Sequence, residues 1–178
     1  ELKARFDEEN NLRWAAEMKN AGVKIINSIP GLKVHAKVAL IVGKVSGKQT
    51  KHALIATGNL NEITSRFYTD HVFFTSHKKI TKELKNLFSF LTERRKPFGH
   101  EEIKFDNLLV SQFNLQKQFL KLIDTEISNA KNDKPAGIIL KMNNLEDMVL
   151  IEKLYEAAEA GVKIDLLVRS ICCLNPEV

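Results

Sequence analysis

The chain has 178 residues, and its 27 Lys and Arg outnumber its 22 Asp and Glu to give a formal net charge of +5. A hydrophobic share of 44% with 28% charged residues is that of an ordinary globular protein of one domain or two small ones. No apolar run could span a bilayer, and the only cysteines, Cys172 and Cys173, are adjacent, which excludes a disulfide framework and a cysteine-based zinc site. We therefore expect a cytoplasmic protein with an anionic partner.

The first part of the chain predicts a strand, a helix and a second strand. Residues 1–6 resemble a strand, although the chain starts without a Met or a capping signal, which suggests a piece of a longer protein. Acidic residues at 7–9 suit a helix N-terminus, and helix formers continue from 8 to 21. Gly22 is placed to end this helix, and residues 23–26 follow as a short strand. The same helix–Gly–strand order recurs around Gly161.

A hairpin and a third strand come next. Residues 32–42 alternate between apolar positions and a face that carries His35 and Lys37, which predicts a strand. Residues 45–50 read as a turn, and residues 53–56 as a buried return strand that ends at Thr57-Gly58-Asn59. Residues 72–74 predict a further strand.

Helices and strands alternate through the rest of the chain. Helical spacing of apolar residues covers 80–91, and the cations, Pro and Gly at 94–99 mark a domain boundary. We place the domains at 1–98 and 99–178. The later elements are a helix at 115–130, a strand at 138–140, a helix at 145–160 and a strand at 162–168. This order predicts an α/β fold in which helices cover the sheets.

One group of polar residues can perform chemistry. His35 and Lys37 lie on the same predicted strand face, and Asn59 follows the return strand. A neutral imidazole is a nucleophile toward phosphorus, an ammonium can hold phosphate oxygens, and an amide can orient either group. A His-x-Lys pair alone has little specificity, so the combination with the Gly-Asn turn carries the prediction.

Several longer motifs point to one family. They are Gly31–Lys37, Ala56–Glu62, Tyr68–Asp70, Val168–Leu174 and the opening residues 1–9. In this order they resemble bacterial polyphosphate kinase over essentially the whole chain, a family related to the phospholipase D superfamily. The resemblance implies a phospholipase-D-like mixed sheet flanked by helices, with most of one such domain in 1–98 and the start of a second in 99–178.

The resemblance also implies an activity, which is reversible transfer of the terminal phosphate of ATP to inorganic polyphosphate through a phosphohistidine. It implies ATP and ADP, polyphosphate and Mg²⁺ as ligands, and a homo-oligomer in the full-length protein. It further implies a cytoplasmic location, free or peripheral to the inner membrane, with no nucleic acid partner. The second histidine-bearing half of the family would follow this chain, so we expect the isolated segment to have little activity.

The family's functional residues transfer to matching positions. His35 corresponds to the phosphorylated histidine, while Lys37 and Asn59 would support the transferring group, by analogy with the superfamily. Tyr68 and Arg169 correspond to nucleotide contacts.

Arg5 corresponds to an arginine of the magnesium–phosphate site. Because a guanidinium donates hydrogen bonds and cannot ligate a cation, we expect Arg5 to hold phosphate beside the metal.

Departures from the family pattern leave alternatives open. The family's second histidine before the turn is Leu54 here, Ala56 replaces a Gly, and Ser170 stands where a Gly is usual. A phospholipase-D-type phosphodiesterase would carry an acid five residues after Lys37, where this chain has Val42. A non-catalytic polyanion-binding module is the third reading.

Overall fold

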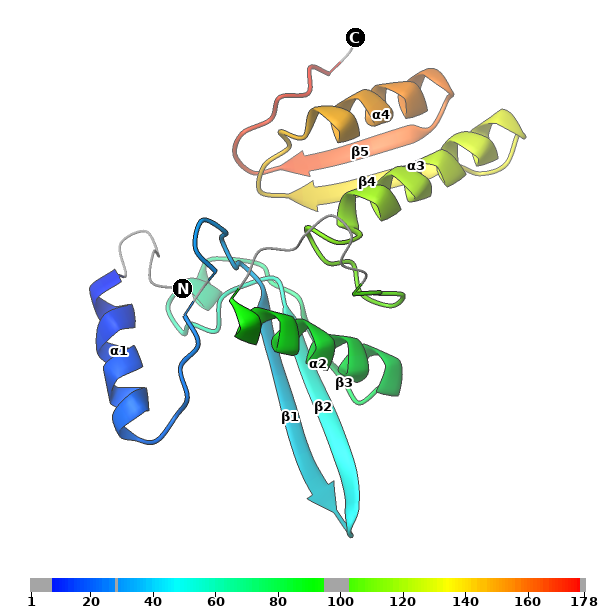
Figure 1. The fold of residues 1–178 in the computed structure, drawn as a ribbon. Coiled ribbons are helices and arrows are strands. Elements are labelled where there is room, and N and C mark those ends of the chain that lie inside the picture. The colour runs from blue at the N-terminus through cyan, green and yellow to red at the C-terminus, as the bar shows by residue number, and fades with distance from the viewer. Residues whose placement is uncertain (1–7, 28, 95–102, 177–178) are drawn as a thin grey trace. The chain divides into compact units, whose positions relative to one another are not determined.

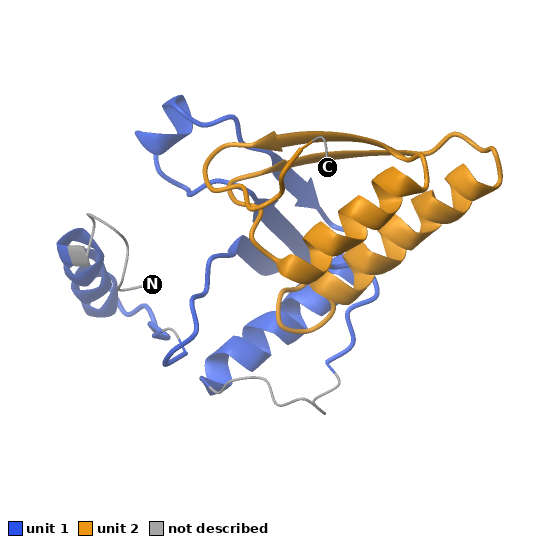
Figure 2. Ribbon diagram, turned by 90° about the horizontal axis from the view of Figure 1, so that it is seen from above, with its two compact units in different colours: residues 1–108 blue, residues 109–178 orange. Residues whose placement is uncertain are grey.

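The computed structural model describes residues 8–27, 29–94 and 103–176, and it divides the chain into two compact units (Figures 1 and 2). Unit 1 spans residues 1–108 and unit 2 spans residues 109–178. Each unit combines helices with a small sheet, so the predicted α/β class is confirmed at this level. In the part of the chain that is described, we find no helix long and apolar enough to cross a membrane.

Unit 1 contains a three-stranded antiparallel sheet in the order β1-β2-β3. The two-residue turn at Ser46 and Gly47 has positive φ values of 50° and 77°, which matches the twist of a tight hairpin. The strands therefore run closer to the turn than the sequence pattern predicted. Their bounds are β1 Lys37–Val45, β2 Lys48–Ala56 and β3 Val72–Thr75.

Two strand predictions in unit 1 are corrected. The strand expected at 32–42 begins only at Lys37, because β2 ends at its partner Ala56 and residues 32–36 join no strand in the described part of the chain. Residues 23–26 are irregular and form no strand. The strand expected at 1–6 lies outside the described residues. Alternation of side chains signals an exposed extended segment, but a strand also needs a backbone partner.

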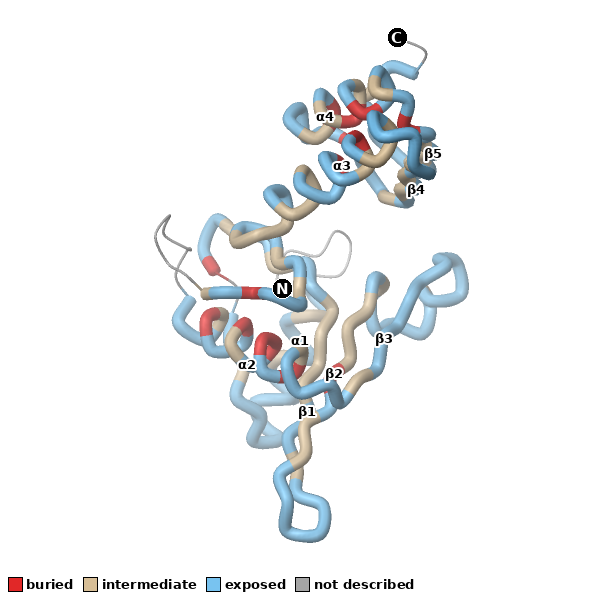
Figure 3. Tube along the Cα trace, turned by 90° about the vertical axis from the view of Figure 1, so that its right-hand side faces the viewer, coloured by how far each residue is buried: buried red, intermediate tan, exposed pale blue. Residues whose placement is uncertain are grey.

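Helix α2 (Lys78–Glu93) covers one face of the sheet. Its buried side chains include Leu84, Leu87 and Phe90, and Ala53 of β2, only 2% exposed, is the one buried residue in the three strands (Figure 3). The predicted helix at 80–91 is confirmed, and it extends two residues further at each end. The sheet face that contains Ala53 is therefore the covered face, and the opposite face is open within unit 1.

A buried carboxylate fixes where unit 1 ends. Glu83 on α2 is 7% exposed and accepts hydrogen bonds of 2.9–3.1 Å from the backbone N–H groups of Asp106, Asn107 and Leu108. The side-chain amide of Asn107 donates a further bond of 2.6 Å. Burial by itself raises the pKa of Glu83, but these hydrogen bonds outweigh it and the pKa lies below its ordinary value. These hydrogen bonds attach residues 106–108 to α2, and unit 1 accordingly extends to residue 108.

Helix α1 (Glu8–Asn20) presents apolar side chains to solvent. Leu12, Trp14 and Met18 are each about half exposed. The helix ends as predicted at Gly22, whose φ of 84° lets the N–H of Val23 reach back to the carbonyl of Met18. Gly161 ends helix α4 (Met148–Glu159) in the same way, so the repeated helix–Gly pattern corresponds to one capping motif used twice.

Unit 2 is a parallel β–α–β arrangement with one additional helix. Strands β4 (Gly137–Met142) and β5 (Lys163–Val168) pair in parallel, connected through α4 (Met148–Glu159), and α3 (Leu115–Lys131) packs against α4. One face of the strand pair packs against the helices, as the alternation of exposed and half-buried residues along both strands indicates. All four predicted elements are present, but α4 begins at Met148 and not at residue 145, because Leu145 forms a β-bridge with Cys172. The buried core comprises Ile123, Ile127, Leu145, Ile151, Leu154, Ala157 and Val162.

Candidate active site

His35 and Lys37 lie at the start of β1. His35 is exposed and precedes the first paired residue by two positions, so strand alternation does not fix the direction of its side chain. The ammonium of Lys37 donates a hydrogen bond of 2.7 Å to the backbone carbonyl of His35. This bond ties the extended segment that carries the imidazole to the first residue of the sheet.

The predicted turn with Asn59 reaches the same end of the hairpin. Ala56, the last residue of β2, pairs with Lys37, and Thr57-Gly58-Asn59 follows directly. Asn59 is exposed. The chain positions of His35, Lys37 and Asn59 therefore lie at the end of the hairpin where β1 begins and β2 ends.

Asp70 closes the loop between β2 and β3. The hydroxyl of Thr57 donates to the Asp70 carboxylate at 3.2 Å and accepts from the N–H of His71 at 3.0 Å, while the N–H of Thr57 donates to the His71 carbonyl at 3.0 Å. The carboxylate lies so close to Gly58 that any side chain there would overlap it. These contacts explain why the turn before Asn59 carries a Gly, and they identify Asp70 as the residue that holds the loop shut.

The loop between these closing contacts positions Tyr68. The side chain of Asn61 accepts hydrogen bonds from the N–H groups of Ile63 and Thr64 at 2.9 and 3.0 Å, which starts the short 3₁₀ helix Thr64–Arg66. The N–H of Tyr68 then donates to the carbonyl of Thr64 at 3.3 Å. Tyr68 is half exposed and lies two residues before Asp70, so the closed loop carries it back toward the end of β2.

Arg169 lies in unit 2, directly after the end of β5. Its Nε donates to the Asn143 side chain at 2.8 Å, and its N–H donates to the Met142 carbonyl at 3.1 Å. Asn143 follows β4, and the carboxyl ends of parallel strands meet at one edge, where α/β sheets commonly bind ligands. The sequence analysis identified Arg169 but missed Asn143, because only the β4–β5 register brings the two together.

The departures from the family pattern fit the backbone without strain. Ser170 does not have a positive φ, and its N–H donates to the Asn143 carbonyl at 2.9 Å. Leu54 is half-buried on β2, where it pairs with Ala39 and Phe74. Ala56 pairs with Lys37 and Val72.

The donors needed for a metal cage are missing from the described residues. Arg5 lies outside them. Within the described ranges, no three His, Cys, Asp or Glu side chains are placed to hold one ion, and the Asp70 carboxylate is engaged by Thr57. The described residues therefore contain no ready-made cage of three such side chains, and we derive no step through the metal.

The chain consists of mixed α/β units, and the candidate residues His35, Lys37 and Asn59 of unit 1 are of types suited to phosphate chemistry. Comparison with known proteins agrees with this class. Residues 1–97 match the family described as polyphosphate kinase C-terminal domain 1, and residues 108–178 match polyphosphate kinase C-terminal domain 2. The chain belongs to the polyphosphate kinase family.

Individual relatives show how much of the family is represented here. The polyphosphate kinases of Escherichia coli K12 and Yersinia pestis are 44% and 46% identical to the chain over all 178 residues. The crystal structure of polyphosphate kinase from Porphyromonas gingivalis matches 99% of the chain with a TM-score of 0.81 and 46% identity. The chain spans 25% of the length of each of the first two relatives and 29% of the third.

Proposed function

We propose that the chain is the phosphohistidine-bearing segment of a polyphosphate kinase, which transfers the terminal phosphate of ATP reversibly to inorganic polyphosphate. The observation that supports this proposal is the strand register, which brings the chain positions of His35, Lys37 and Asn59 to one end of the β1–β2 hairpin. It is supported by the family membership, since these residues lie in the segment that matches C-terminal domain 1.

The chemistry has two balanced steps. An imidazole nitrogen of His35 donates its lone pair to the γ-phosphorus of ATP, the P–N bond forms, and the bond to the bridging oxygen breaks with its electron pair leaving on ADP. A terminal oxygen of polyphosphate then attacks the same phosphorus, and the imidazole leaves unchanged. An ammonium has three N–H donors, so Lys37 can hold the His35 carbonyl and a phosphate oxygen together. Asn59 would donate to the transferring group.

The remaining residues bind substrate in this proposal. Tyr68 and Arg169 contact the nucleotide, and a guanidinium suits its phosphates because it donates two parallel hydrogen bonds. Arg5 holds phosphate oxygens. Mg²⁺ enters only with the phosphates of ATP. We further propose that each unit belongs to a phospholipase-D-like domain.

The proposal is tested in a chimera in which this chain replaces the matching residues of the E. coli relative. With ATP labelled at the γ-phosphate, we expect acid-labile, alkali-stable label on the chimera. His35→Ala should reduce the label to background because the attacking nitrogen is lost. His77→Ala is the matched control, since that exposed side chain makes no capping hydrogen bond at α2.

Other outcomes would favour a different function. Label that persists in His35→Ala would place the nucleophile elsewhere. A chimera that binds polyphosphate but never takes up label would favour the polyanion-binding module. The phosphodiesterase reading lacks support, because Val42 of β1 is half exposed and supplies no carboxylate. We expect the isolated 178-residue chain to take up little label, since it spans a quarter of its relatives' length.

A further inference from the structure

Positive charge is concentrated in one segment of unit 1. Residues 18–61 contain seven lysines and no Asp or Glu. Because the whole chain carries only +5, the rest of the sequence is net negative. The segment includes the complete β1–β2 hairpin, whose lysines therefore have no acidic neighbour on the two strands.

The strand register divides the four lysines of the hairpin between its faces, with Lys37 and Lys48 on one face and Lys44 and Lys51 on the other. Positions 37, 41 and 45 of β1 pair with positions 56, 52 and 48 of β2, so Lys37, His52 and Lys48 lie on the same face. These three side chains are four residues apart along the strands, or about 13 Å at the usual rise per residue. This set of two lysines and one histidine, which we call the cation row, starts beside His35 and ends at the hairpin tip.

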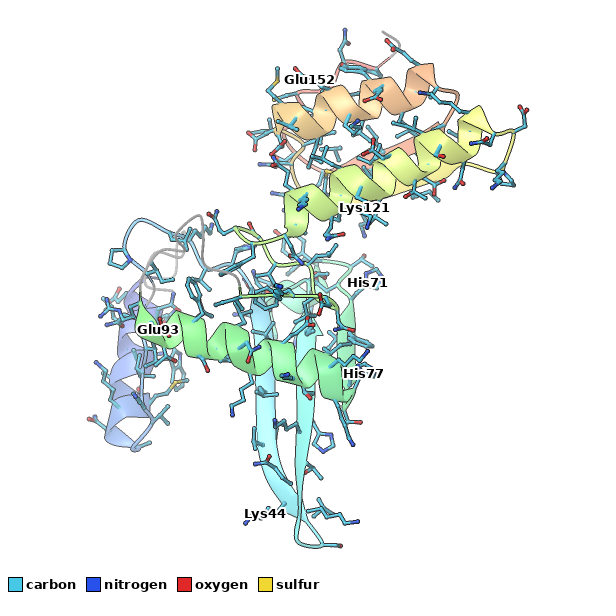
Figure 4. All side chains as sticks on the ribbon, turned by 45° about the vertical axis from the view of Figure 1, so that its right-hand side comes forward. Lys44, His71, His77, Glu93, Lys121 and Glu152 are labelled. Atoms are coloured by element: carbon cyan, nitrogen blue, oxygen red, sulfur yellow. The ribbon has the colours of Figure 1, made fainter. Side chains whose placement is uncertain are left out.

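The cation row lies on the open face of the sheet. Ala53, the buried residue under α2, has the opposite parity on β2 and faces away from the row. His52 and Lys48 are exposed, and Ile41, which pairs with His52, is 66% exposed. Figure 4 shows the hairpin extending well past α2, with Lys44 near its far end. A long ligand could therefore follow this face.

The side chains of the hairpin suit one kind of polyanion. Single-stranded nucleic acids gain much of their affinity by stacking bases on aromatic rings. Residues 37–56 contain no Phe, Trp or Tyr. The aromatic ring on this face is Phe74 of β3, which pairs with Leu54 beside the start of the hairpin, so the length of the hairpin offers no succession of rings. A chain of phosphates without bases needs only cations at intervals, which the cation row provides.

We propose that the open face of the β1–β2 hairpin is a binding track for linear polyphosphate, which runs from the catalytic end at Lys37 past His52 to Lys48 at the tip. This inference rests on the proposed function, because it names the path taken by that function's second substrate. The track holds the polyphosphate along its length while one end of the polyphosphate reaches His35.

The test compares two charge reversals on the intact 178-residue chain. Lys48→Glu alters the cation row. Lys44→Glu makes the same charge change near the tip but on the opposite face, because the Lys44–Gln49 pair is next to the Val45–Lys48 pair and successive pairs face opposite sides of the sheet. Calorimetry at low salt measures the binding of long-chain polyphosphate and of tripolyphosphate. We expect Lys48→Glu to weaken long-chain binding about fivefold relative to Lys44→Glu, the effect of one exposed ion pair. Tripolyphosphate is too short to reach the tip and should not distinguish the variants.

The other possible results would contradict the proposed binding track, each for a different reason. Equal losses in the two variants, or equal discrimination with tripolyphosphate, would show a general charge effect and leave the proposed function standing. Failure of the unaltered chain to bind long-chain polyphosphate would count against both the track and the proposed substrate. Tighter binding of single-stranded DNA with the same dependence on Lys48 would reassign the face to nucleic acid.

Discussion

At the scale of single residues, the close approach of Asp70 to Gly58 is the tightest constraint near the site. A methyl group at position 58 would overlap the carboxylate and separate it from the Thr57 hydroxyl. Gly58→Ala should therefore destabilise the chain by about 1 kcal/mol in urea unfolding, because the exposed Asp70 side chain must turn away and lose its hydrogen bond to Thr57. Gly43→Ala is the control, because a methyl group there meets only the Thr50 hydroxyl at an ordinary 3.8 Å.

Removal of the Asp70 carboxylate should relieve the overlap. In Gly58→Ala combined with Asp70→Ser, we expect the loss to be smaller than the sum of the two single losses. If Gly58→Ala unfolds at the same urea concentration as Gly43→Ala, the loop is not held by these contacts.

Glu83 gives the stability of unit 1 a dependence on pH. Its pKa is lowered in the folded state, so its carboxylate stabilises the fold above the unfolded pKa of about 4.3. That contribution is lost as the pH falls through the lower, folded pKa. Glu83→Gln replaces an acceptor with an amide donor that faces backbone N–H groups, and it should cost about 1–3 kcal/mol at pH 7.

Unfolding in urea between pH 7 and pH 3 measures this effect. Glu83→Gln should also flatten the acid-induced loss of stability, whereas Glu17→Gln, on the exposed face of α1, should leave it unchanged. An equally steep acid profile in Glu83→Gln would show that other carboxylates control it.

At the scale of elements, the sequence predicts best where local chemistry decides the structure. The helix at 115–130 and the Gly22 and Gly161 caps are found as expected because propensity and positive φ act within a few residues. The sequence analysis started the first hairpin strand at residue 32, before its true start at Lys37, because alternation cannot reveal that the partner strand β2 stops at Ala56.

The same difference between local signals and long-range contacts applies to the candidate site. His35, Lys37 and Asn59 could be predicted, since their residue types and motifs carry the chemistry. Asp70 and Asn143 could not be assigned roles, because each acts on a partner that only the loop closure or the strand register brings near. Glu83 was missed for the same reason, as its donors lie more than twenty residues away in sequence.

At the scale of the whole molecule, the two units have separate hydrophobic cores. Leu84, fully buried, belongs to the core of unit 1, and Leu154, 2% exposed, to that of unit 2. Truncation of a buried leucine leaves a cavity and costs about 2–5 kcal/mol. Because each core is made within one unit, we expect Leu154→Ala to speed amide hydrogen exchange in α3, α4, β4 and β5 while the exchange of β2 and α2 stays unchanged.

Leu84→Ala should do the reverse and speed exchange in β2 and α2 alone. Mass spectrometry of the intact chain resolves the two sets of amides, so each variant serves as the control for the other. Faster exchange in both units after either substitution would mean that the chain unfolds as one cooperative body. Separate responses would mean that the cation row and Arg169 are carried by units that keep their own stability, and substitutions in one site could then be interpreted without damage to the other.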